Sequence, residues 1–174
     1  MLLVALGSLS CSQEKTAYVD NEKVAEEYYK LKDMRERYDK KQAELSKEID
    51  SLAAPFQKLY DEYMEKRDNM SQKNRQQKEQ QLRKMQQQIR AKQNQESRKL
   101  QQERGAEADS LVKVMEDKIA DYADNKGYTY IFGSNQSSNI IYGDKSKNIT
   151  DDVIKMLNEG QAESKEDNAE DQQE

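Results

Sequence analysis

Apolar residues recur at alternating steps of four and three along residues 24–70, and this spacing constrains the fold more than any other feature of the chain. It is the spacing of a coiled-coil seam, which forms one narrow stripe along a helix. Most stripe positions are apolar or aromatic, including all six from Leu45 to Tyr63. Between Val24 and Asn125, only one Pro and one Gly interrupt the helical pattern. The sequence therefore predicts a long, thin helical projection, a shape suited to binding or holding rather than to catalysis.

The composition favours an extended helical protein over a compact globule. Of the 174 residues, 36% are charged and 34% are hydrophobic, which leaves little apolar surface for a large core. The chain contains no His, no Trp and a single Cys. Zinc sites of the Cys/His kind, Ser-His-Asp triads and disulfide frameworks are therefore excluded or nearly so. We expect no enzymatic activity, no cofactor and no metal, because the abundant carboxylates fall on solvated helix faces.

The net charge of −5 hides two segments of opposite sign. Residues 65–104 are rich in Gln and contain twelve Lys or Arg against five acidic residues, a net charge of +7. Residues 159–174 contain seven acidic residues, one Lys and almost nothing apolar, which is typical of a disordered acidic tail. The basic segment is either a solvated helix face or a surface that attracts acidic partners or anionic lipid.

The first eleven residues resemble a bacterial lipoprotein signal. The run MLLVALGSLS is apolar, ends in small residues and directly precedes Cys11, which in such a signal becomes the lipidated first residue. No basic residue precedes this run, so we expect the true start upstream, and Ser8 rather than Leu occupies the third position before Cys11. The alternative is a soluble protein with an incidental Cys. In either case we expect residues 1–11 to lie outside the fold and the mature chain to contain no transmembrane helix.

The middle of the chain predicts a helical hairpin over residues 21–126. Thr16–Asp20 is a strand candidate, and Asp20 can cap the helix that follows. We expect one helix over residues 21–68 with a kink at Pro55 and a turn near residues 69–74. A second helix should cover residues 74–125, weakened near Gly105. Its apolar residues recur at steps of eleven, which keep a stripe on a nearly straight helix: Ile89, Leu100, Leu111 and Tyr122.

The segment that follows the hairpin predicts a small β body. Residues 128–143 contain two β-prone runs around a polar loop, which indicates a β-hairpin, and residues 150–158 form a short helix capped by Thr150. A sheet of about three short strands is too small to anchor so long a projection alone. We therefore expect chains to associate through their strands, using the large side chains Tyr130, Phe132, Ile140 and Tyr142.

These segments resemble the Skp/OmpH family of periplasmic chaperones. The resemblance covers residues 16–158 and rests on Ala17-Tyr18-Val19-Asp20, Val24, Gly127-Tyr128-Thr129-Tyr130-Ile131, Asn139-Ile140-Ile141-Tyr142 and Asn148-Ile149-Thr150-Asp151-Asp152-Val153-Ile154. It implies an α+β, mainly α, fold in which a small β body bears a long antiparallel coiled-coil arm. It also implies a homotrimer whose arms enclose a cavity for unfolded outer-membrane proteins. Cys11, the Gln-rich arm and the acidic tail depart from the family pattern.

We therefore predict an ATP-independent holdase in the periplasm of a Gram-negative bacterium, anchored to a membrane if Cys11 is lipidated. Seam residues are expected to pack the two helices together, which leaves flexible Met, aromatic and basic side chains for clients. These client-binding candidates are Tyr60, Met64, Met70, Met85, Lys73, Arg75, Lys78, Arg83 and Lys84. The alternative is a structural envelope tether or adaptor that uses the hairpin as a spacer. Export would remove nucleic acid as a physiological partner of the basic segment.

Overall fold

The structure is a computed structural model that describes residues 14–134, 140–159 and 161. Cys11 with the rest of the leader, the loop of residues 135–139, Gly160 and the acidic segment beyond Gln161 lie outside the described residues. The chain forms two compact units. The first, here called the body, contains Met1–Leu31 and Val112–Glu174, and the second, called the arm, contains Lys32–Leu111.

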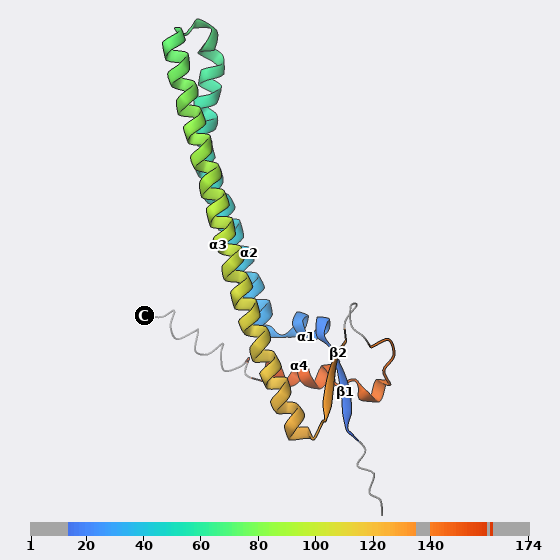
Figure 1. Cartoon of the computed structure of the whole chain (residues 1–174). Helices are drawn as coiled ribbons and strands as arrows, with labels where there is room; N and C mark the ends of the chain where they lie inside the picture. Colours follow the sequence, from blue (N-terminus) through green and yellow to red (C-terminus); the bar gives the residue numbers. More distant parts are fainter. Residues whose placement is uncertain (1–13, 135–139, 160, 162–174) are drawn as a thin grey trace, which may run out of the picture. The chain divides into compact units, whose positions relative to one another are not determined.

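The chain is mainly α-helical with one small sheet, as its sequence predicts (Figure 1). In chain order the elements are β1 (Thr16–Asp20), α1 (Asn21–Glu27), α2 (Tyr29–Lys66), the 3-10 helix η1 (Arg67–Asn69), α3 (Gln72–Lys126), β2 (Tyr130–Ser134), the 3-10 helix η2 (Lys145–Lys147) and α4 (Thr150–Asn158).

The sheet of the body pairs β1 with β2 in parallel, with Thr16 opposite Tyr130. This differs from the β-hairpin expected over residues 128–143, because the described residues 140–143 form no strand. The sheet thus has two strands rather than about three. The parallel pair is favoured over the β-hairpin because it buries Ala17 and Val19 of β1. β-propensity without a buried face is a weak determinant of strand pairing. On its other side, β1 makes only an isolated bridge to Asn148.

The core of the body lies between the sheet and two short helices. α4 contacts both α1 and β1, and its buried residues follow the spacing of a single helix face. The buried side chains there include Ala17, Val19, Val24, Tyr28, Ile149, Val153, Ile154 and Leu157. Asp20 caps α1, as expected, because its side chain accepts the N–H groups of Glu22 and Lys23. The predicted cap of α4 by Thr150 is wrong: Thr150 is the first residue of the helix, and its N-cap residue Ile149 makes no side-chain cap. The Asn148 side chain instead accepts the Thr150 N–H at 3.0 Å.

The first helix is interrupted at Tyr28, where the sequence predicts a continuous helix over residues 21–68. Tyr28 is extended (φ −67, ψ 115), and α2 begins at the next residue. The Asn158 side chain accepts the N–H of Tyr29 at 3.0 Å and donates to the carbonyl of Glu27 at 3.0 Å. The break therefore leaves these two backbone groups paired, which removes most of its cost. The Tyr28 side chain is fully buried.

In the arm, α2 and α3 lie side by side and run in opposite directions (Figure 1). The side-chain pairs that join them step forward along α2 and backward along α3: Lys41–Glu103 at 3.7 Å, Glu48–Lys92 at 3.3 Å and Tyr63–Glu79 at 2.7 Å. Buried apolar residues occur at both ends of this pair, with Met34 and Tyr38 at one end and Tyr63 and Leu82 at the other.

The chain reverses through η1, Met70 and Ser71. The Ser71 hydroxyl accepts the N–H of Asn74 at 3.3 Å and so caps α3. α3 continues through Gly105 without a break, because one Gly costs only about 1 kcal/mol in a helix of good helix formers. Within the described ranges, no helix has an apolar stretch long enough to cross a membrane.

Candidate functional site

A largely exposed apolar row, in which only Phe56 is half-buried, runs along α2 in the arm. It consists of Leu52, Phe56, Tyr60 and Met64, which are spaced by four residues and are therefore neighbours on the helix surface. Leu52 is 43%, Tyr60 41% and Met64 46% exposed. The rings of Phe56 and Tyr60 stack with centroids 6.2 Å apart. Tyr60 and Met64, two of the predicted client-binding residues, thus belong to one continuous row, which we call the apolar row.

Leu52 was expected in the seam between the helices, and the structure places it at the exposed edge of that seam. Its neighbour Ala53 is more covered than Leu52. Leu52 is 43% exposed and lines a groove together with Met85 and Ile89 of α3. One heptad further along, Leu59 is half-buried again. The sequence count of seam positions alone therefore missed Leu52 as a surface residue.

Two apolar grooves flank Ile89 at the level of Pro55. The first, of about 550 Å³, has Leu52, Pro55 and Met85 in its lining. The second, of about 450 Å³, is lined in part by Ala53, Ala54 and Phe56. The small side chains of Ala53 and Ala54 explain the free space, because they do not fill the interval between α2 and α3. Met85, a predicted client contact, is half-buried in the first groove.

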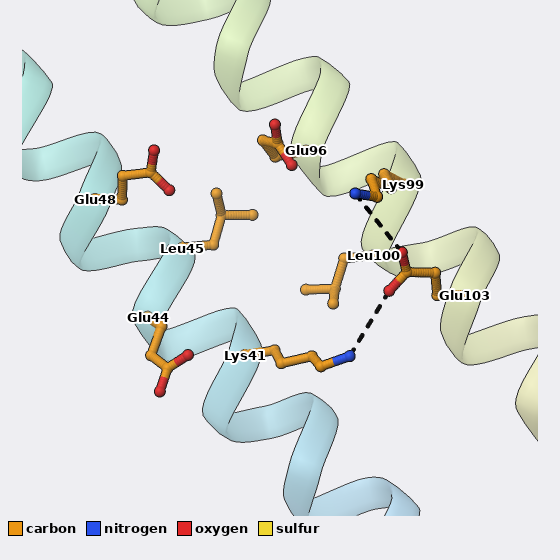
Figure 2. A pocket seen from close by; sticks show the side chains of 8 residues that line it. All are labelled: Lys41, Glu44, Leu45, Glu48, Glu96, Lys99, Leu100 and Glu103. Carbon is orange, nitrogen blue, oxygen red and sulfur yellow. Dashed lines mark ion pairs between the residues drawn. The ribbon is translucent and has the colours of Figure 1, made fainter.

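A third groove on the arm has a different character (Figure 2). Leu45 and Leu100 face each other between the helices, and charged side chains surround them. Glu103 joins Lys41 at 3.7 Å and Lys99 at 4.0 Å. The volume is about 280 Å³. The ion pairs cover this part of the seam, so the groove belongs to the packing of the hairpin rather than to a binding surface.

The predicted basic contacts do not form one patch. Lys73, Arg83 and Lys84 are exposed, whereas Arg75 and Lys78 are half-buried. Arg83 lies 3.8 Å from the carboxylate of Glu79, which also accepts the Tyr63 hydroxyl. The hydrogen bond to the Glu79 carboxylate raises the pKa of Tyr63, and burial of the phenol adds a smaller effect in the same direction. The remaining candidate, Met70, is half-buried beside η1.

The body also carries exposed apolar side chains. Tyr130 and Phe132 of β2 are 54% and 49% exposed, and their rings stack with centroids 5.9 Å apart. Ile141 and Tyr142 are almost fully exposed, whereas Ile140 is half-buried. In the described part of the chain, β2 pairs with β1 alone. Open strand edges with apolar side chains are surfaces that proteins normally cover. Sequence reasoning named Tyr130, Phe132 and Tyr142, and it missed Ile141.

A family model described as outer membrane protein (OmpH-like) matches residues 15–157. The chain belongs to the OmpH-like family. Its structure is similar to a crystal structure from Caulobacter crescentus CB15 whose protein is provisionally assigned as an OmpH-like outer membrane chaperone. The TM-score is 0.73 over 89% of this chain and 90% of that chain, and the two sequences are 10% identical. At this identity the likeness shows the fold alone. The comparison with curated proteins found no match.

The segments that resemble the family meet in the body of this OmpH-like chain. The Asp20 N–H donates to the Thr150 hydroxyl at 2.9 Å, and that hydroxyl donates to the Asn148 side chain at 2.6 Å. Lys23 pairs with Asp151 at 2.7 Å. Asp20 and the Asn-Ile-Thr-Asp sequence therefore act together to join the start of α1 to the start of α4.

The exposed features of the OmpH-like chain are apolar and basic surfaces, which suit the binding of polypeptides or anionic groups. Among the residues that the structure describes, no cluster of three His, Cys, Asp or Glu side chains could hold a metal ion. The apolar row with its two grooves is therefore the candidate site of the arm, and the exposed side chains of β2 and residues 141–142 are the candidate site of the body.

Proposed function

We propose that this OmpH-like protein is an ATP-independent holdase of the periplasm, which binds unfolded outer-membrane β-barrel proteins and prevents their aggregation. The apolar row beside two apolar grooves carries this proposal. A holdase needs modest affinity for many sequences, and Met and aromatic side chains can repack around different clients. Membership of the OmpH-like family supports the chaperone class.

The chains associate as homotrimers through their bodies, and clients occupy the cavity that the three arms enclose. The exposed Tyr130, Phe132 and Tyr142 support this association, because they are large apolar side chains that a single chain leaves in water. Their location on the body leaves the apolar row of each arm available to clients.

Suppression of aggregation tests the holdase directly. The wild-type protein should keep an unfolded β-barrel membrane protein in solution without ATP. Tyr60→Ser with Met64→Ser should weaken client binding about tenfold or more, since burying each large apolar side chain is worth about 1.5 kcal/mol or more. The matched control is Lys58→Ser with Glu62→Ser, which places the same residue at two exposed polar positions of α2. Equal suppression by both variants would remove the apolar row from client binding, whereas a wild type without any suppression would favour the tether.

The basic residues should affect how fast acidic clients bind. Reversal of Lys73, Arg75, Lys78, Arg83 and Lys84 to Glu leaves the apolar row intact. Association with acidic clients should slow, and its salt dependence should flatten or reverse, because attraction over the Debye length of about 8 Å is lost. Circular dichroism should show that the arm stays helical. Identical association kinetics across a salt series would assign the basic residues to solvation alone.

Cys11 anchors the protein to a membrane through its lipid. Stable anchoring needs at least two acyl chains, which a lipidated N-terminal Cys provides. The wild-type protein should fractionate with membranes, and Cys11→Ala should release it into the soluble periplasm. A wild type that is fully soluble after lysis at low salt would contradict the anchor without affecting the holdase proposal.

A further inference from the structure

Of the two apolar grooves that flank Ile89 in the arm, the larger one has Pro55 in its lining and the smaller one does not. We call the larger one the proline groove. Its volume is about 550 Å³, and its apolar lining residues are Leu52, Pro55, Met85 and Ile89. This volume lies in the range of pockets that hold small organic ligands. The proline groove is therefore large enough to take a whole side chain of a bound polypeptide.

Pro55 leaves a backbone acceptor at the wall of the proline groove. In a regular helix, the N–H of residue 55 would donate to the carbonyl of Ser51, four residues earlier. Pro has no N–H, and its ring clashes with that carbonyl. Pro55 lies inside α2, and both Pro55 and Ser51 line the groove. The Ser51 carbonyl therefore lacks its usual intrahelical donor and can accept a hydrogen bond from an occupant of the groove.

The charged residues in the lining of the proline groove are paired with each other. They are Glu48 and Lys92, whose carboxylate and ammonium groups lie 3.3 Å apart. Lys92 also contacts Glu96 at 3.2 Å, so no positive charge is left for an acidic occupant. What remains is the partial negative charge of the Ser51 carbonyl, which is complementary to an N–H or O–H donor. The electrostatics of the groove thus favour a neutral occupant that carries a donor.

We propose that the proline groove binds aromatic side chains that carry a hydrogen-bond donor, namely the Trp and Tyr side chains of unfolded clients. Among large apolar side chains, these two combine a ring with an N–H or O–H group. The ring packs on Leu52 and Ile89 and contacts the thioether of Met85, while the donor bonds the Ser51 carbonyl. Phe and Leu exclude water from this carbonyl without giving it a donor, which costs affinity. The identity of the clients rests on the proposed holdase function, whereas the preference for a donor does not.

Two peptides that differ in one donor test the proposal. The probe is a capped, uncharged peptide of Gly, Ser and Leu residues with a single Trp at its centre. Its partner contains 1-methyltryptophan, whose ring has no N–H. The chain contains no Trp, so the indole emission of the peptide reports its binding directly. The Trp peptide should bind about fivefold more tightly, as expected for one net hydrogen bond, and its emission should shift to shorter wavelength as the ring leaves water.

Two substitutions locate this preference. Pro55→Ala restores the N–H of residue 55, so the Ser51 carbonyl regains its intrahelical bond, and the two peptides should then bind with equal affinity. Circular dichroism should show no loss of helix, because Ala favours a helix far more than Pro does. The matched control, Gln86→Ala, alters the lining of the smaller groove and should keep the preference for the Trp peptide.

Three results would overturn the proposal: equal binding of both peptides by the wild type, no detectable binding of either, or a preference that survives in Pro55→Ala. Equal binding would assign the Ser51 carbonyl to water or to a backbone N–H of the peptide. The holdase proposal is judged separately by suppression of aggregation. A protein that suppresses aggregation but does not distinguish the peptides keeps the holdase function and loses this preference. A protein that distinguishes them without suppressing aggregation contradicts the holdase function alone.

Discussion

Tyr28 is completely buried in the body, and within the described residues its hydroxyl has no hydrogen-bond partner. Its ring meets that of Tyr29 edge to face, with centroids 5.6 Å apart. Burial raises the pKa of the Tyr28 phenol, so this side chain stays neutral. The ring therefore supplies packing, while the hydroxyl loses its hydration without an equivalent bond in return.

Substitutions at Tyr28 should separate these two contributions. Tyr28→Phe should leave the free energy of unfolding unchanged or raise it by about 1 kcal/mol, because it removes an unsatisfied hydroxyl. Tyr28→Ala should lower it by about 3–5 kcal/mol, because it leaves a cavity in the core. Urea denaturation of both variants measures the difference. A loss of more than about 1 kcal/mol in Tyr28→Phe would mean that the hydroxyl bonds a partner such as water.

The Arg37–Glu107 pair in the arm makes stability depend on pH. Its hydrogen bond from Arg37 holds the pKa of the Glu107 carboxyl below the ordinary value, and the Tyr38 hydroxyl adds to this effect. A carboxyl with a lowered pKa stabilises the fold above its unfolded value of about 4.3, and this stabilisation is lost as pH falls through the folded value. Both side chains are partly exposed, so the contribution is at most about 1 kcal/mol.

Glu107→Gln should therefore destabilise the arm slightly near neutral pH. The difference in unfolding free energy between wild type and variant should shrink toward zero as the pH falls below about 4. High salt at neutral pH should reduce it too. Thermal unfolding across a pH series measures this difference, and a difference that is constant from pH 7 to pH 3 would exclude the ion pair as its cause.

Among the elements, the break between α1 and α2 depends on one side chain distant in sequence. Asn158→Ala should lower the free energy of unfolding by about 1–3 kcal/mol, because the Tyr29 N–H and the Glu27 carbonyl lose their partner. The Tyr29 amide should also exchange faster with deuterium. Asn158→Asp keeps the acceptor for the Tyr29 N–H, so its free energy of unfolding should lie between those of the wild type and Asn158→Ala. The control is Asn94→Ala on the exposed side of α3, and unchanged exchange at Tyr29 in Asn158→Ala would refute the role of Asn158.

The helical hairpin and the small sheet were predictable, because seam spacing and cap residues are local signals. The break at Tyr28 was not, because Tyr is compatible with a helix and Asn158 lies 129 residues from Tyr29. The strand expected after the polar loop was wrong for a similar reason: the runs before and after the loop are both β-prone, and the burial of Ala17 and Val19 that favours the pairing of β1 with β2 is not a local signal. The apolar row was foreseen at Tyr60 and Met64, whereas the seven-residue count assigned Leu52 to the seam and so concealed it.

For the whole molecule, association through the body is the central expectation. A chain that begins at Ser12 should form a soluble trimer. Phe132→Asp should dissociate it, because a charge buried in the interface costs several kcal/mol. Phe132 is 49% exposed in the single chain, so the variant should still fold. Light scattering should show a fall from three chains to one. Thr129→Asp, at an exposed polar residue just before β2, is the control, and a trimeric Phe132→Asp protein would place the interface elsewhere.

The parallel pairing of β1 with β2 also sets an order of folding. Thr16 lies opposite Tyr130, so the sheet closes a loop of 114 residues, and contacts so distant in sequence form slowly. Pairing of α2 with α3 across residues 32–111 removes most of this loop and lowers its closure cost by about 1 kcal/mol. Pairing of α2 with α3 should therefore begin near η1 and extend toward the strands. During synthesis the arm is nearly complete before β2 is available to join β1, which makes the body the last part to form.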